Sequence, residues 1–139
     1  MFVGVFLAGV GLQRLARLTF PPVHAMRLIG FGLIGGAIML ALSSVGAFVV
    51  ARTTIVPFST ASKLVTWGPF RFTRNPMYVS LVLAYLGFAA IYYQLLALVL
   101  LVVPILFLST IVIPFEEGRM REVFGDTYVQ YCARVRRWL

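Results

Sequence analysis

The chain has 139 residues, of which 61% are hydrophobic and only 12% are charged, whereas a soluble domain has about 25% charged residues. This composition excludes a disordered protein, a soluble nucleic-acid-binding module and a disulfide scaffold. A single cysteine and a single histidine leave no cluster of metal ligands, and we interpret the net charge of +8 as a sign of membrane topology.

The N-terminal segment is apolar but short. Residues 1–12 carry no charge, and Arg14 and Arg17 follow. This pattern fits a short or tilted span over about residues 2–18, with the arginines reaching back to the interface, or a helix lying in the interface plane. We favour the span. A cleaved signal peptide is not expected, because no basic n-region precedes the apolar segment.

Two longer segments without charged residues, 28–51 and 75–115, predict the other spans. A bilayer core about 30 Å thick needs about 20 helical residues, so the first segment can cross once and the second twice. Tyr92-Tyr93-Gln94 predicts the turn of the second segment, since tyrosine favours the membrane interface. The sequence therefore predicts spans at about 28–50, 77–92 and 94–113, with a kink at Pro104.

These elements predict an all-α fold, a single polytopic membrane domain over residues 1–139 with about four transmembrane helices. The segments 52–76 and 116–139 hold nine basic residues, against three on the opposite side. Basic residues concentrate on the cytoplasmic side of membrane proteins. We therefore expect both segments and both termini to face the cytoplasm.

Small residues gather on one face of the span at 28–50. Gly30, Gly32, Gly35 and Gly36 are expected to allow close helix packing, either within the chain or against a second copy of it.

Two polar clusters should meet at the cytoplasmic end of the predicted hairpin 77–113. Asn75-Pro76 is a helix-start signal directly after Arg74, and Glu116-Glu117 follow the hairpin. A helical hairpin returns the chain to the side it left, so the clusters should be neighbours. One interpretation is a capped helix entry and a solvated pair of glutamates. The other is a binding site for a zwitterionic, partly aromatic ligand, with Tyr78 and Phe70 beside it.

The segment after Glu117 predicts an amphipathic helix. Its apolar residues recur at helical spacing, and Gly125 interrupts the pattern in a way that could break the helix in two. The stripe comprises Met120, Phe124, Tyr128, Tyr131 and Val135. One interpretation of this tail is an interfacial helix held to anionic lipid by its arginines.

At these clusters the sequence resembles the superfamily of isoprenylcysteine carboxyl methyltransferases and phospholipid methyltransferases, in particular its short bacterial members. The resemblance covers about residues 52–139. It rests on four motifs in order, which are Gly68-Pro69-Phe70, Arg74-Asn75-Pro76-Met77-Tyr78, Glu116-Glu117, and the run from Phe124-Gly125 to Tyr128 and Tyr131.

This resemblance implies an enzyme of the inner membrane that transfers a methyl group from S-adenosylmethionine to a lipophilic acceptor, whether a carboxylate, a thiol or a lipid amine. Glu116 would bind the amino-acid end or the ribose of the cofactor, and Arg74 and Glu117 would be the catalytic residues. The other cofactor contacts implied by the resemblance are Ser62, Lys63, Leu64, Val65, Phe70, Asn75, Pro76, Met77 and Tyr78.

Two positions depart from the family pattern. Asn75 stands where many members have histidine, and asparagine cannot act as a general base because it does not titrate. Val112 stands where the prenylcysteine enzymes have an arginine for the substrate carboxylate, which argues against a prenylcysteine substrate.

Two other functions remain open from the sequence. One is a non-catalytic membrane scaffold whose basic tail binds anionic lipid. The other is a membrane reductase that uses NADPH. Loss of the arginines after Tyr131 is expected to damage a scaffold and to leave an enzyme unaffected, whereas loss of Glu116 is expected to do the reverse.

Overall fold

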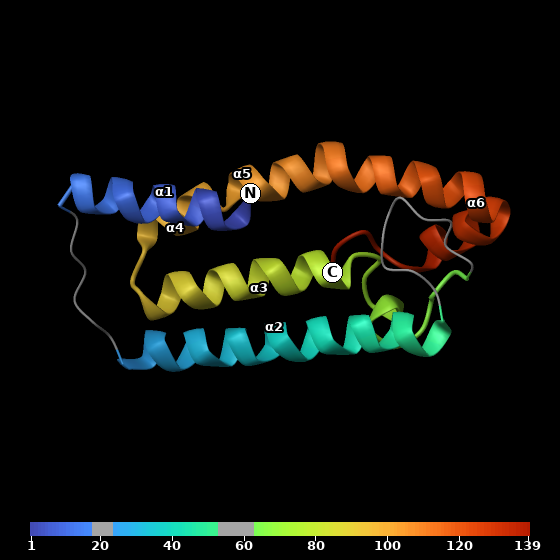
Figure 1. Ribbon diagram of the computed structural model, residues 1–139, viewed down its shortest axis with the longest axis horizontal. Helices are drawn as coiled ribbons and strands as arrows, with labels where there is room; N and C mark the ends of the chain where they lie inside the picture. The colour runs from blue at the N-terminus through green and yellow to red at the C-terminus, as the bar shows by residue number, and fades with distance from the viewer. Residues whose placement is uncertain (18–23, 53–62) are drawn as a thin grey trace.

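The computed structural model describes residues 1–17, 24–52 and 63–139, and within these ranges the regular structure is helical. Helix α2 and helix α3 run side by side in one layer, and helix α1 packs on helix α4 (Figure 1). The elements are α1 (Phe2–Leu15), α2 (His24–Ala51), the 3-10 turn η1 (Gly68–Arg71), α3 (Pro76–Ile91), α4 (Leu95–Leu100), α5 (Val102–Phe107), the π-helical turn η2 (Leu108–Val112) and α6 (Ile113–Arg134).

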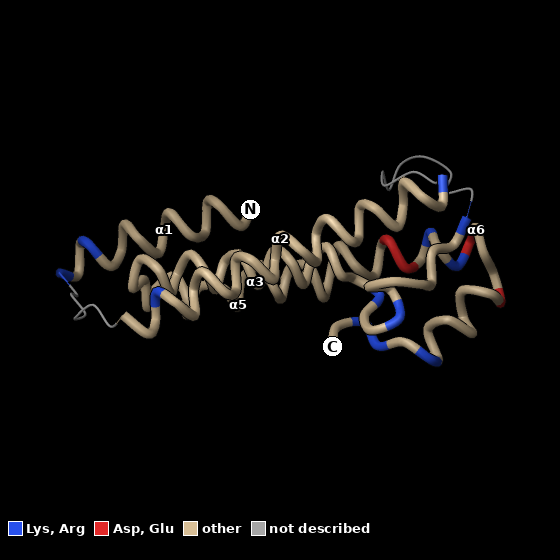
Figure 2. The backbone as a smooth tube through the Cα atoms, turned by 90° about the horizontal axis from the view of Figure 1, so that it is seen from below, with Lys and Arg blue, Asp and Glu red and all other residues tan. Residues whose placement is uncertain are grey.

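The all-α prediction is confirmed, and each predicted span contains a helix. Two helical stretches, His24–Ala51 and Leu95–Arg134, are long and apolar enough to cross a membrane. The other two, α1 and α3, are apolar but have only 14 and 16 residues. Helix α1 lies along the bundle and not across it, and charged residues gather at the two ends of the bundle (Figures 1 and 2). The four-span topology stays a prediction.

The last helical stretch deviates from a regular α-helix at three places. The α-helical pattern is interrupted at Leu101, three residues before Pro104, where a proline deprives the preceding turn of a donor. A π-helical turn follows at Leu108–Val112. Gly125 has a φ of 51° inside α6 and bends the chain, as the sequence predicted. The bend turns the C-terminal segment back toward the start of α3 (Figure 1).

The predicted hairpin turn is confirmed and is fixed by α1. Helix α3 ends before Tyr92, Tyr93 has a φ of 54°, and Gln94 precedes α4. The buried Gln13 amide donates to the Tyr93 carbonyl at 2.9 Å and accepts from the Leu96 N–H at 3.3 Å. This one side chain therefore ties α1 to the end of the bundle farthest from Glu116.

Close packing between α2 and α3 depends on one glycine from each helix, Gly30 and Gly87. A Cβ on Gly30 would lie 2.8 Å from the Gly87 carbonyl oxygen, and a Cβ on Gly87 would lie 2.9 Å from that of Gly30. Gly32, Gly35 and Gly36 face open space. Of the four glycines of α2 that were expected to allow close helix packing, only Gly30 therefore does so within the chain.

Replacing Gly87 with alanine is expected to destabilise the bundle by about 1–3 kcal/mol, because the added methyl group overpacks the contact with α2. Thermal unfolding of the purified protein in nanodiscs would measure the loss. Gly36→Ala adds the same methyl group in open space and is the matched control. Equal unfolding temperatures for the two variants would contradict the close contact.

Candidate active site

The entry to α3 is held against α2 by apolar contacts. Gly68 has a φ of 62°, which favours glycine, and begins η1. The Phe70 ring is buried and packs edge-on against Phe48 at 5.1 Å between centroids. The Tyr131 hydroxyl donates to the Phe70 carbonyl at 2.8 Å, and burial raises the pKa of Tyr131 to about 12, which keeps this donor protonated. These contacts fix the backbone that leads to Arg74.

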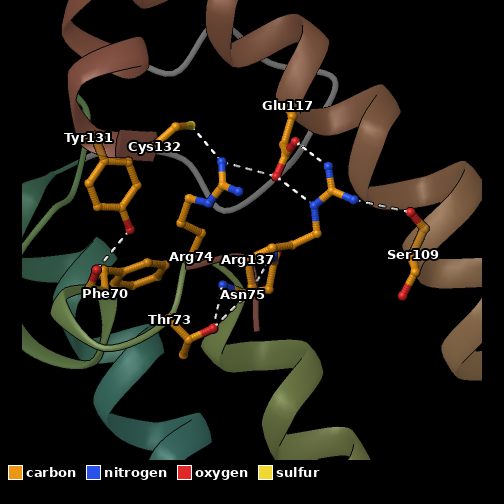
Figure 3. A network of polar contacts seen from close by, with 9 residues as sticks. All are labelled: Phe70, Thr73, Arg74, Asn75, Ser109, Glu117, Tyr131, Cys132 and Arg137. Atoms are coloured by element: carbon orange, nitrogen blue, oxygen red, sulfur yellow. Dashed lines mark hydrogen bonds and ion pairs between the residues drawn. The ribbon is translucent and has the colours of Figure 1, made fainter. Parts of the chain in front are cut away.

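Glu117 is the centre of a charged network at the end of the hairpin (Figure 3). Glu117 is only 5% exposed. Arg74 Nη1 lies 3.2 Å from Glu117 Oε1, and Arg137 donates through Nε to Oε1 at 3.1 Å and through Nη2 to Oε2 at 2.8 Å. The same Arg74 nitrogen donates to Cys132 Sγ. A buried carboxylate needs such partners to remain charged.

The backbone of the C-terminal segment completes the network. The Arg137 carbonyl accepts from Thr73 Oγ1 at 3.1 Å and from Asn75 Nδ2 at 2.9 Å. The Arg136 carbonyl accepts from the Arg74 N–H at 3.0 Å. Asn75 is thus the residue before α3, as predicted, but its side chain binds the tail and does not cap the helix.

The π-helical turn supplies a carbonyl to the same network. The Ile113 N–H donates to the Leu108 carbonyl, five residues back. The corresponding partner of the Ser109 carbonyl would be Pro114, which has no N–H. This carbonyl is therefore free to accept from Arg137 Nη1 at 3.4 Å. π-Helical turns are frequent at functional sites, and this one positions an acceptor there.

Glu116 has a different environment from that of its neighbour. It is half-buried, and its Oε1 accepts from the Tyr78 hydroxyl at 2.8 Å. Burial raises the pKa of Glu116, and the hydrogen bond from Tyr78 lowers it by a smaller amount. The Glu116 carboxylate therefore has one neutral partner at this position. It can still accept a hydrogen bond from a cationic group or a hydroxyl of a ligand.

The structure brings together five of the predicted site residues, Arg74, Asn75, Tyr78, Glu116 and Glu117. Three others lie in the protein core, because Val65, Phe70 and Pro76 are almost fully buried. Lys63 is exposed, and Leu64 and Met77 are partly exposed. Ser62 lies outside the described residues.

The interpretation that assigned every arginine after Tyr131 to the lipid surface is wrong for Arg137. Its side chain binds Glu117 at the centre of the network. The sequence signal for this contact is weak, because it needs the bend at Gly125 to return the tail to α3. Tyr131 and Cys132 were also not predicted as site residues, and both reach the network through the same bend.

A model of the phospholipid methyltransferase family matches residues 25–127 of the chain. The protein belongs to this family. No curated protein and no solved structure matches the chain. The phospholipid methyltransferase match covers α2, α3 and the hairpin with both glutamates. It ends before Tyr131, Cys132 and Arg137.

Membership in the phospholipid methyltransferase family makes the protein an S-adenosylmethionine-dependent membrane enzyme. Methyl transfer is thereby favoured over the scaffold and the NADPH-dependent reductase. The polar residues fit this cofactor, which carries an ammonium, a carboxylate and a ribose. Glu116 has acceptor capacity for the ammonium or for a ribose hydroxyl. The Arg74 Nε atom is buried and has no hydrogen-bond partner among the described residues.

The raised pKa of Glu116 predicts a pH-dependent stability. A folded-state pKa above the unfolded value of 4.5 means that protonation favours folding. The contribution is complete below that unfolded value and is lost as the pH rises through the folded one. Glu116→Gln should remove this part of the pH dependence of the unfolding temperature, measured without cofactor, whereas Glu122→Gln at an exposed position should not. Parallel profiles for wild type and Glu116→Gln would contradict the buried environment.

Proposed function

We propose that the protein transfers a methyl group from S-adenosylmethionine to the amine of a phospholipid headgroup at the cytoplasmic surface of the membrane. The network that joins Arg74, Glu117 and Arg137 beside the Glu116–Tyr78 pair carries this proposal. The family supports a phospholipid as the acceptor class. A carboxylate or a thiol on another lipophilic molecule is the remaining alternative.

In this proposal Glu116 and Tyr78 bind the cofactor. The Glu116 carboxylate accepts from the ammonium or from a ribose hydroxyl, and Tyr78 keeps the carboxylate oriented. The half-buried position of both residues supports this role, because a ligand can reach them while most bulk water is excluded. Lys63, Leu64 and Met77 complete the contacts, while Val65, Phe70 and Pro76 support the loop from the core.

Arg74 and Glu117 act on the side of the acceptor. The guanidinium of Arg74 can bind the phosphate of a headgroup through donors that Glu117 does not occupy. Asn75 donates through Nδ2 to the tail, so its Oδ1 can accept from an amine. Because asparagine does not titrate, Asn75 can orient a neutral amine but cannot remove a proton from an ammonium.

Methyl transfer requires alignment more than covalent help from the protein. S-Adenosylmethionine supplies a methyl group that its sulfonium has already activated. The chain contributes a fixed geometry, and orientation of this kind can account for about 7–11 kcal/mol of a barrier. The network of buried charges and backbone carbonyls supports such pre-organisation, because each charged side chain in it has at least one fixed partner.

The first test is calorimetric binding of S-adenosylmethionine and S-adenosylhomocysteine to the protein in nanodiscs. Wild type should bind both saturably, and Glu116→Gln should weaken binding because a neutral amide attracts an ammonium less strongly. Glu122→Gln at an exposed position is the matched control. Wild-type affinity in Glu116→Gln would remove this residue from the cofactor site.

The second test identifies the acceptor by transfer of a labelled methyl group in nanodiscs. Ethanolamine phospholipid should be methylated, and choline phospholipid should not, because its nitrogen has no remaining position. Arg74→Ala should abolish transfer, whereas Arg71→Ala on the exposed side of η1 should retain it. Wild-type turnover by Arg74→Ala, or transfer only to a carboxylate or a thiol, would contradict the proposal.

A further inference from the structure

We propose that Arg137, in the C-terminal tail, is a positioning residue of the active site, which orients Glu117 through its side chain and Asn75 through its backbone. This inference rests on the proposed function and adds a residue that lies beyond the family match at residues 25–127. Arg137 touches both residues but needs no contact with cofactor or acceptor to act.

The side-chain contact fixes the plane of the Glu117 carboxylate. Nε and Nη2 of Arg137 bind one oxygen each, at 3.1 and 2.8 Å. Two parallel bonds of this kind define an orientation that a single contact leaves free. Arg74 meets the same carboxylate only at Oε1, at 3.2 Å. The ion pair between Arg74 and Glu117 therefore depends on the orientation that Arg137 imposes on the carboxylate (Figure 3).

The backbone contact fixes the amide of Asn75. A carbonyl can only accept, so the Asn75 atom that faces the Arg137 carbonyl at 2.9 Å must be the nitrogen. The amide is planar, and its oxygen therefore points away from the tail. Thr73 donates to the same carbonyl at 3.1 Å and accepts from the Asn75 N–H at 3.1 Å, which holds the carbonyl and the amide in one arrangement.

The Arg137 side chain is itself anchored from a third direction. Nη1 donates to the Ser109 carbonyl that the π-helical turn and Pro114 leave without a helical donor. Arg137 thus joins the hairpin, the entry to α3 and the tail at one point. Its neighbours Arg134 and Arg136 are exposed.

Charge and geometry can be separated by substitution. Lysine keeps the positive charge but cannot form two parallel bonds to a carboxylate. Alanine removes both the charge and the bonds while leaving the backbone carbonyl in the chain. If Arg137 acts by orienting Glu117, then Arg137→Lys should retain only part of the activity that Arg137→Ala loses.

The kinetic test compares Arg137→Ala and Arg137→Lys with Arg134→Ala, at an exposed position outside the network, in nanodiscs of zwitterionic lipid. Arg137→Ala should lower kcat by about 10- to 100-fold, as expected for a small misplacement of reacting groups, with little change in the KM for S-adenosylmethionine. Arg137→Lys should be intermediate, Arg134→Ala should resemble wild type, and added methylguanidinium should restore part of the activity of Arg137→Ala. A kcat for Arg137→Ala equal to that of Arg134→Ala would overturn the inference. A loss of kcat that follows the loss of thermal stability and is not rescued by methylguanidinium would also overturn it.

A second measurement does not depend on activity. Unfolding temperatures of Arg137→Ala, Glu117→Gln and the double variant form a cycle, and the two losses should not be additive because the residues share two bonds. Additive losses would overturn the pairing whatever the enzyme does. A wild-type protein that neither binds S-adenosylmethionine nor transfers its methyl group would refute the proposed function, and the cycle would still decide whether Arg137 orders Glu117.

Discussion

The burial of one carboxylate, that of Glu117, is the constraint on which the site depends. An ionised carboxylate at 5% exposure is stable only when charged donors surround it. Here the donors come from two segments far apart in the sequence, Arg74 at the entry to α3 and Arg137 in the tail. Charge pairing therefore requires the hairpin to close and the tail to return. The same contacts that satisfy Glu117 bring Asn75 to the tail and Tyr78 to the first turn of α6.

The irregular parts of the last helical stretch make this arrangement sterically feasible. A regular helix from Leu95 to Arg134 would carry the tail about 60 Å along one axis at 1.5 Å per residue, away from α3. Gly125 accepts a positive φ without the strain that a Cβ would add, and so allows the chain to turn back. The π-helical turn and Pro114 release the Ser109 carbonyl, which then holds the returning Arg137.

Local sequence signals predicted the elements, whereas the choice of helix faces depended on tertiary contacts. The segments without charge, Asn75-Pro76 and the tyrosine turn predicted the hairpin, and the hairpin in turn predicted that Arg74 meets the glutamates. Spacing could not distinguish Gly30 from Gly32 and Gly36, because only contact with Gly87 decides which face is close. Arg137 looked like its exposed neighbours, since neither periodicity nor composition encodes where a bent tail ends.

The two adjacent glutamates show how one helix end can serve two purposes. Successive helical residues point about 100° apart, so Glu117 turns toward both arginines while Glu116 turns toward Tyr78. Glu117 accepts from three guanidinium nitrogens of two arginines, whereas Glu116 accepts from a single neutral hydroxyl. Its raised pKa follows from burial without a cation, and a cationic ligand would stabilise the carboxylate. Neighbouring carboxyl groups in unlike environments commonly have separate roles in enzymes. The contacts of Glu117 with both arginines are therefore compatible with the cofactor-binding role proposed for Glu116 in the same pair.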